Sequence, residues 1–129
     1  MTEGEKQQLG ERLATVRERL VDAARAAGRR PEEIRLVAVS KLHPVEAVQA
    51  AFALGQRAFG ENYVQEALAK QEAFPELAAQ GGEWHCIGHV QTNKAKDVAG
   101  RFALIHTVDS VKFAETLARR LAPGANRQA

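Results

Sequence analysis

The chain has 129 residues, of which 45% are hydrophobic and 26% are charged, a balance typical of one ordinary globular domain. Its formal net charge of +2 is too small to indicate binding to nucleic acid or to a membrane surface. The single cysteine, Cys86, excludes an internal disulfide and fits a reducing compartment. The first residues lack the apolar segment of a signal peptide, and no stretch approaches the length of a membrane span. We therefore expect a cytoplasmic protein.

The first predicted element is an amphipathic helix that ends before Gly28. Its apolar residues recur at alternating spacings of four and three, with charged residues on the other faces: Leu9, Leu13, Val16, Leu20, Ala23 and Ala27. Gly28 supplies a stop signal, and Pro31 reinforces it. A coiled-coil seam is the alternative, but the stripe is short and alanine-rich. This favours packing against the body of the same domain.

Strands and helices then alternate four times with short connections. Predicted strands cover residues 34–40, 57–60, 84–88 and 102–107, and predicted helices cover 45–54, 64–74, 93–99 and 111–121. Asp109 or Ser110 is expected to cap the last helix. Residues 75–83 are expected to form a loop, and residues 123–129 a frayed tail. Near-continuous apolar strands joined by helices predict a parallel sheet with right-handed crossovers.

Two architectures fit this alternation. One is a compact doubly wound sheet, and the other is half of a (β/α)8 barrel, since a complete barrel typically needs about 250 residues. In both, the functional site lies at the carboxyl ends of the strands. There the sequence places polar and ionisable residues after every strand: Lys41, then Glu61, Asn62 and Tyr63, then His89 and Gln91, then Asp109 and Ser110. This convergence is a stronger indication of a site than any single residue.

Lys41 follows an apolar run and precedes Pro44, so it is expected where a buried strand meets its first loop. Partial burial there would favour the neutral amine, which can attack a carbonyl group to form a Schiff base. Most lysines just after a strand are solvated loop residues. From Lys41 alone, the solvated interpretation is favoured.

Other chemistries find little support. The sequence has no G-x-G-x-x-G, G-x-x-x-x-G-K-[ST] or G-x-S-x-G motif, so nucleotide-fold and serine-hydrolase hypotheses have no starting point. His85 and His89 lie four apart on a predicted strand, and no cysteine or carboxylate cluster completes a metal site. Cys86 is interpreted as a core residue rather than a nucleophile.

Several polar residues each allow more than one interpretation. Glu61 is a candidate general base, although a capping role or pairing with a lysine is at least as good an interpretation. Asn62 can donate and accept hydrogen bonds at the mouth of a site. Lys94, together with Lys96, lies early in a predicted helix whose N-terminal amides attract anions. These lysines either contact phosphate or belong to a solvated face, and the solvated face is favoured.

Three runs of sequence together resemble the pyridoxal-phosphate homeostasis family, small proteins that bind pyridoxal 5′-phosphate (PLP) and are related in fold to alanine racemase. The runs are AVSK at 38–41 followed by Pro44, FGENYVQE at 59–66, and WHCIGHVQTNK at 84–94. The segment HTVDS at 106–110 also resembles the family's fourth strand and turn. The resemblance extends from the first helix to about Leu121. It implies a partial (β/α)8 TIM-type barrel, with residues 1–129 as a single domain that forms the amino-terminal half of a PLP-binding barrel.

The resemblance also implies roles for individual residues. Lys41 matches the lysine that holds PLP as an internal aldimine, Asn62 matches a position lining the cofactor pocket, and Lys94 matches a lysine near the site. His89, in the third run, completes the predicted cofactor-binding set. The sequence departs from the family at His43, where a second lysine is common, and at Cys86, usually an aromatic residue or Met.

Length is the larger departure. Family members continue through four more βα units that carry a phosphate cradle and an arginine facing the pyridine nitrogen, and these units do not follow Leu121 here. We therefore expect weak retention of PLP.

The function implied is PLP binding for intracellular PLP homeostasis or delivery, with PLP-dependent apoenzymes as candidate partners and no reaction catalysed by the protein itself. One alternative is a PLP-dependent racemase or decarboxylase of the same fold, for which Tyr63 is the only tyrosine that could act as a second acid–base residue. Another is a non-catalytic interaction module. The unpaired edges of a half barrel also predict self-association.

Overall fold

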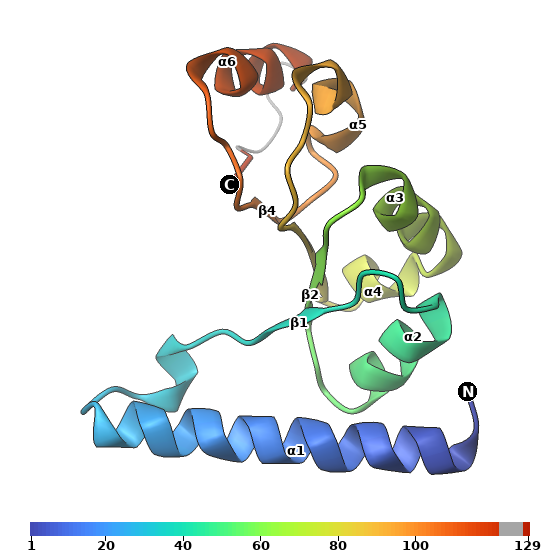
Figure 1. The fold of residues 1–129 in the computed structure, drawn as a ribbon, viewed down its shortest axis with the longest axis vertical. Helices are drawn as coiled ribbons and strands as arrows, with labels where there is room; N and C mark the ends of the chain where they lie inside the picture. The colour runs from blue at the N-terminus through green and yellow to red at the C-terminus, as the bar shows by residue number, and fades with distance from the viewer. Residues whose placement is uncertain (122–127) are drawn as a thin grey trace.

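The computed structural model describes residues 1–121 and 128–129. Its centre is a sheet of four short parallel strands in the order β1-β2-β3-β4 (Figure 1). The strands are β1 (Val37–Val39), β2 (Ala58–Glu61), β3 (Glu83–Cys86) and β4 (Leu104–Ile105). The helices that follow them are α2 (Val45–Ala53), α3 (Val64–Ala73), α4 (Glu76–Ala79), α5 (Ala95–Val98) and α6 (Val111–Arg120).

These helices pack on one face of the sheet, which decides between the two architectures. A doubly wound sheet carries helices on both faces and reverses its strand order at a switch point. Here the order is sequential, and the buried side chains of the strands join those of α2 to α6 in one apolar cluster. The prediction of a partial (β/α)8-type barrel is therefore confirmed.

The core lies between the sheet and these helices. Phe59 and Trp84 point into it from neighbouring strands, with their ring centroids 6.1 Å apart, and Phe113 of α6 is almost completely buried there. Cys86 is 1% exposed, and burial raises the pKa of its thiol, so its interpretation as a core residue is confirmed. We call this side of the sheet the covered face and the opposite side the open face.

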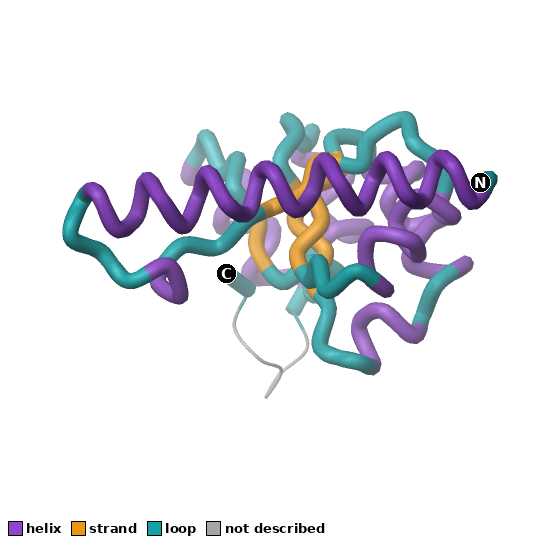
Figure 2. Tube along the Cα trace, turned by 90° about the horizontal axis from the view of Figure 1, so that it is seen from below, coloured by secondary structure: helices purple, strands orange, loops and turns teal. Residues whose placement is uncertain are grey.

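The long N-terminal helix α1 (Glu3–Ala26) lies outside this arrangement, and Figure 2 shows it as a rod that runs across the molecule. Thr2 begins the helix with a capping box, and Gly28, with φ of 70°, follows its end. Arg17 donates to the carbonyl of Leu54 at 2.9 Å, and Leu9 packs against the core. The helix therefore packs on its own domain, as predicted. Among the described residues, no helix is long and apolar enough to cross a membrane.

The remaining elements differ from the prediction mainly in length. Pairing limits the first and last strands to three and two residues. The predicted loop at 75–83 contains α4, whose Leu77 is fully buried, and the predicted helix at 93–99 divides into a 3-10 turn, Thr92–Lys94, and α5. A second 3-10 turn, Pro31–Glu33, precedes β1. Ser110 caps α6, since its Oγ accepts from Phe113 N at 3.1 Å.

The expected fraying of the tail can be assessed only at its end, because residues 123–127 lie outside the described part. Gln128 and Ala129 contact β4: Ile105 N donates to Ala129 O at 2.8 Å, and Gln128 Nε2 donates to Phe102 O at 2.7 Å. For these two residues the prediction is wrong, because the edge of β4 offers them backbone hydrogen-bonding groups.

Candidate functional site

Lys41 lies on the turn between β1 and α2. His43 N donates to Ser40 O at 3.1 Å to close this turn, and Leu42 has a φ of 64°. A left-handed conformation is uncommon for a residue with a bulky apolar side chain, so its surroundings must hold it there. The side chain of Lys41 itself is exposed. This agrees with the solvated interpretation that is favoured from Lys41 alone, and the alternative of partial burial is not found among the described residues.

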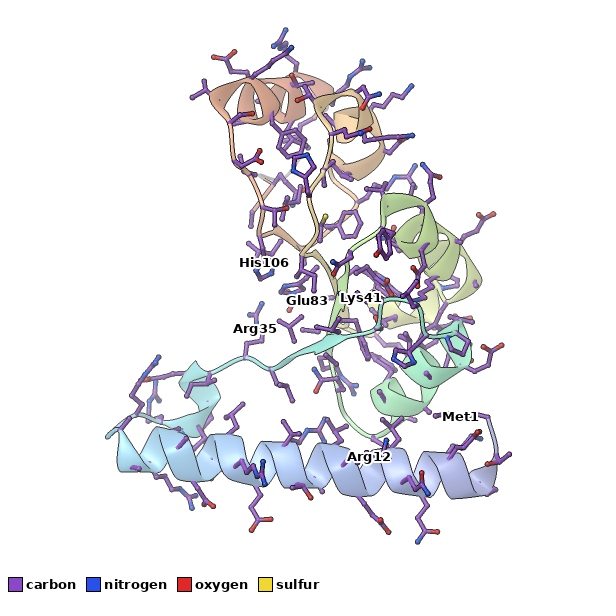
Figure 3. The ribbon with its side chains drawn as sticks, viewed as in Figure 1. Met1, Arg12, Arg35, Lys41, Glu83 and His106 are labelled. Atoms are coloured by element: carbon purple, nitrogen blue, oxygen red, sulfur yellow. The ribbon has the colours of Figure 1, made fainter. Side chains whose placement is uncertain are left out.

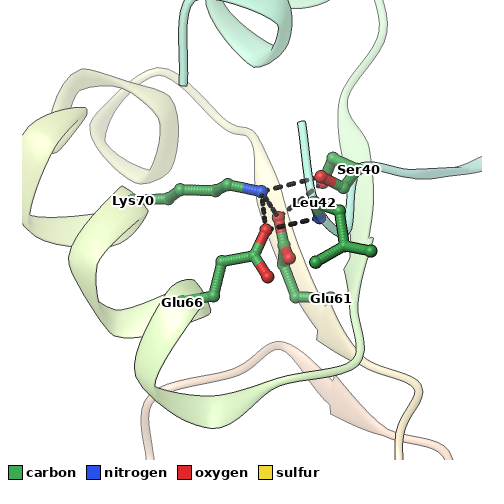
Figure 4. Close-up of polar contacts among 5 residues, drawn as sticks. All are labelled: Ser40, Leu42, Glu61, Glu66 and Lys70. Atoms are coloured by element: carbon green, nitrogen blue, oxygen red, sulfur yellow. Dashed lines mark hydrogen bonds and ion pairs between the residues drawn. The ribbon is translucent and has the colours of Figure 1, made fainter. Parts of the chain in front are cut away.

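The two residues that flank Lys41 are both bound to a buried polar cluster, shown in Figure 4. Ser40 accepts from Lys70 Nζ through its carbonyl at 2.7 Å and donates from its hydroxyl to Glu61 Oε1 at 2.8 Å. Leu42 N donates to Glu66 Oε1 at 2.5 Å. The backbone is therefore anchored immediately before and immediately after Lys41.

Lys70 is at the centre of this cluster. Its ammonium lies 2.5 Å from Glu61 Oε1 and 2.8 Å from Glu66 Oε1, in addition to its bond to Ser40. A lysine ammonium has three donors, and all three are used. The hydrogen bond from Lys70 is the main cause that holds the pKa of Glu66 below its usual range, and the Leu42 amide adds to it. Of the roles left open for Glu61, the pairing with a lysine is confirmed.

Asn62 follows β2, and its backbone lies against Gly88, which follows β3. Ile87 N donates to Glu61 O at 3.0 Å, which continues the pairing of these strands beyond β3. A Cβ atom on Gly88 would lie only 2.2 Å from Asn62 O, so the residue after Ile87 has to be glycine. Thr107 Oγ1 in turn donates to Gly88 O at 2.5 Å. The carboxyl ends of β2, β3 and β4 are thus tied together, with the half-buried Asn62 at their edge.

His89 and Lys94 follow β3 at the same edge. His89 is exposed, and its Nδ1 lies 3.3 Å from Asp109 Oδ2. Lys94 is half-buried at the end of a 3-10 turn, with its amide bound to Gln91 O at 2.8 Å. The structure thus places Lys41, Asn62 and His89 just after strands, and Lys94 further on, at the start of α5. The contacts among residues 1–121 and 128–129 join none of the four to another.

A second polar array occupies the open face, where Figure 3 labels Arg35, Glu83 and His106. Arg35 Nη1 lies 2.9 Å from Glu83 Oε1, and His85 Nδ1 lies 2.9 Å from His106 Nε2. One imidazole of such a pair must donate and the other accept. His85 is 1% exposed, and burial lowers its pKa, an effect that Glu83 at 3.7 Å partly offsets.

A cavity of about 620 Å³ lies between α1 and the β1–α2 unit. It is lined by Leu9, Arg12, Ala38, Ser40 and His43 among others. Lys41 does not line it. The cavity therefore reaches the flanks of the turn rather than the lysine itself.

Lys70 and Glu66 were not among the predicted site residues. A signal was present, because Lys70 follows Ala67 by three positions and precedes Phe74 by four, in the buried stripe of α3. A lysine in such a stripe needs a charged partner, and Glu66 lies one turn before it.

Comparison with known proteins assigns the chain to a family. The model described as "Alanine racemase, N-terminal domain" matches residues 12–128. The chain belongs to this family. Among curated proteins, it is 50% identical over 105 residues to the pyridoxal phosphate homeostasis protein of Escherichia coli (strain K12). The aligned region covers 81% of this chain and 45% of that protein. The corresponding Pseudomonas aeruginosa protein is 46% identical over 116 residues, or 90% of this chain and 49% of that protein.

Solved structures agree with this assignment. PipY of Synechococcus elongatus PCC7942, with PLP bound, aligns with a TM-score of 0.72 and 43% identity over 87% of this chain and 47% of that one. An unknown protein from Bifidobacterium adolescentis aligns with a TM-score of 0.85 and 29% identity. The alignment covers 93% of this chain and 52% of that one. The predicted resemblance to pyridoxal-phosphate homeostasis proteins is confirmed. The chain spans about half the length of the curated relatives it matches.

The residues present fit two groups of PLP, its aldehyde and its phosphate. An exposed primary amine on a turn anchored at both flanks suits an aldehyde, because the carbon of the aldehyde can reach the amine without entering the core. Lys94, at the same edge of the sheet, is a cation that suits a phosphate group.

Proposed function

We propose that this chain binds PLP through an aldimine at Lys41 and serves PLP homeostasis or delivery in the cell, without catalysing a reaction of its own. The observation that carries the proposal is the exposed Lys41 amine at the carboxyl end of β1, on a turn whose two flanks are bound to a buried polar cluster. The PLP bound to PipY, 43% identical to this chain, supports the choice of ligand.

The chemistry requires only the amine and an aldehyde. The neutral amine of Lys41 attacks the aldehyde carbon, a C–N bond forms, and the carbonyl oxygen leaves as water with both protons of the amine. Water adds back to the C=N bond and releases the aldehyde. Since the side chain is exposed, water has access for this reverse step, which suits a protein that releases its ligand.

The other predicted residues would contact the remainder of the ligand. We propose Asn62 as a donor and acceptor beside the ring, His89 as a further contact, and Lys94 as the cation nearest the phosphate. PLP-dependent apoenzymes, and a second copy of this chain along the sheet edges, remain predicted partners. Because the chain covers only about half of its relatives, we expect it to release PLP faster than the full-length Escherichia coli protein does. Equal rates in a side-by-side dissociation measurement would contradict this.

The first test is an absorbance spectrum of the chain mixed with PLP, taken before and after borohydride reduction and followed by peptide mapping. We expect a visible aldimine band and a reduced adduct on Lys41 that is lost in Lys41→Ala. Lys6→Ala is the matched control, since Lys6 is an exposed lysine on α1 outside the predicted site. Adducts spread evenly over surface lysines would refute the proposal.

The absence of catalysis has its own test. Tyr63, the only tyrosine in the sequence, is 53% exposed and follows β2. Incubation with PLP and L-alanine in deuterium oxide should give no exchange at Cα above that caused by free PLP. Exchange that disappears in Tyr63→Phe would show a racemase-like activity instead.

A further inference from the structure

We propose that Lys70 is the positioning residue for Lys41. Its buried ammonium holds the β1–α2 turn in the conformation that presents the Lys41 amine for capture of an aldehyde. The consequence for PLP rests on the proposed function, whereas the hold on the turn can be measured without any ligand.

The geometry links Lys70 to both flanks of Lys41. On the amino-terminal side, the ammonium binds the carbonyl of Ser40 directly and binds Glu61 Oε1, the atom that also accepts from the Ser40 hydroxyl. On the carboxyl-terminal side, it binds Glu66 Oε1, the atom that also accepts from the Leu42 amide. Each carboxylate oxygen therefore bridges Lys70 and the turn.

The charges explain why this arrangement depends on the ammonium. Two carboxylates converge on one nitrogen, and without its positive charge they repel each other. The side chain of Glu61 is completely buried and that of Glu66 is 23% exposed, so only Glu66 can turn towards solvent. When it does so, the Leu42 amide loses its acceptor.

The backbone at Leu42 makes the turn sensitive to that loss. Leu42 is the only non-glycine residue with a positive φ among residues 1–121 and 128–129, and its side chain is 75% exposed. A strained conformation persists only where surrounding contacts determine it. The apolar side chain contributes little because it lies in solvent, so the amide bond to Glu66 and the closure onto Ser40 hold the conformation.

A lysine that only filled space in the core would behave differently. Its replacement would lower the stability of the whole chain, and the turn would open no more easily relative to other segments than it does now. A positioning lysine loosens the turn selectively. Amide hydrogen exchange separates the two cases, because it reports opening residue by residue.

The test uses matched variants of the full chain. Lys70→Met keeps the aliphatic stem and removes the ammonium, and Lys96→Met makes the same change on the exposed surface of α5. Lys70→Met leaves a buried carboxylate unpaired and can fail to fold. A second pair therefore changes the partly exposed Glu66: Glu66→Ala removes the acceptor for Leu42 N, and Glu66→Gln retains a carbonyl oxygen there.

In Lys70→Met and Glu66→Ala we expect the Leu42 amide to exchange at least about tenfold faster, with the helical amides of α6 unchanged. Glu66→Gln and Lys96→Met should resemble the unmodified chain. In the PLP arm, the equilibrium constant for the Lys41 adduct should fall about tenfold in the two loosened variants, since misplacement of a reacting group by about 1 Å can cost up to a hundredfold.

The outcomes separate the two proposals. Unchanged exchange at Leu42 in folded Lys70→Met or, if that variant does not fold, in Glu66→Ala would overturn the positioning role. So would a looser turn that still captures PLP as well as before. If the unmodified chain forms no adduct at Lys41, the proposed function fails, and the exchange data alone decide whether Lys70 holds the turn.

Discussion

The two faces of the sheet differ in how completely this chain buries them. On the covered face, apolar side chains of four strands meet those of five helices, and the buried charges of Glu61 and Lys70 lie in contact with each other. On the open face, Val39 is 52% exposed and His106 is exposed. Each face keeps one buried polar atom with no hydrogen bond among the described residues: Glu61 Oε2 on the covered face and His85 Nε2 on the open face. Closure of a barrel turns this second face inward. Stability thus resides on the covered face, and the candidate site lies at the edge between the two.

The largest effect should come from the covered face. Phe59 is 1% exposed and packs against Trp84, so Phe59→Ala removes buried apolar area and leaves a cavity. We expect a loss of about 3–5 kcal/mol in the free energy of unfolding, measured by urea denaturation. Phe59→Leu keeps more of the apolar volume and should cost clearly less. Equal losses for both would show that the ring is not the packed group.

A smaller loss should follow from the edge where the faces meet. Gly88→Ala places a Cβ atom against the backbone of Asn62, so the ends of β2 and β3 must separate. We expect a cost of about 1–3 kcal/mol by urea denaturation, together with weaker PLP capture.

The matched control is Gly4→Ala in the first turn of α1, where the nearest atom to the new Cβ is 3.9 Å away. It should be neutral or stabilise the chain by up to about 1 kcal/mol, because alanine is the better helix former. A neutral Gly88→Ala would mean that the strand ends are not held as closely as the structure has them.

The sequence predicted which residues lie at the carboxyl ends of the strands, but not which side chains contact each other there. Lys41, Asn62 and His89 follow strands as expected, because strand periodicity and parallel pairing depend on local pattern. Lys94 lies early in the segment that was predicted as a helix. The contact between Ser40 and Lys70 spans 30 positions and depends on how α3 is rotated against the sheet. Hydropathy does not specify that rotation.

The exposure of Lys41 agrees with the solvated interpretation, but the local sequence alone did not exclude partial burial. An apolar run predicts a buried strand, yet the cover over the residue that follows it depends on elements elsewhere in the chain. The short helix α4 was missed because four residues are too few for a helical period to be recognised.

A pH-dependent effect should arise from the open face. Burial lowers the pKa of His85 from 6.5, so the unfolded chain binds a proton at a pH where the folded chain does not. The contribution of His85 is therefore fully present above the unfolded pKa and declines as the pH falls below it. We therefore expect the free energy of unfolding to fall as the pH is lowered through the unfolded pKa of about 6.5.

The charged and titratable neighbours Glu83, His106 and Arg35 remain in place in His85→Gln, so the difference between this variant and the unmodified chain isolates the histidine. Urea denaturation across the pH range should give a flatter profile for His85→Gln. Parallel profiles would mean that His85 titrates alike in the folded and unfolded chain.

The smallest effect should come from Val39, on the open face of the edge strand β1. The side chain is half-exposed in the single chain, so Val39→Ser removes little buried area and should change the free energy of unfolding by no more than about 0.5 kcal/mol. The change should also be independent of protein concentration. A larger loss that grows with concentration would show that a second copy covers this face, because association stabilises the folded state by mass action. Val39→Ser therefore measures whether the open face stays open in solution, the condition on which the contrast between the two faces depends.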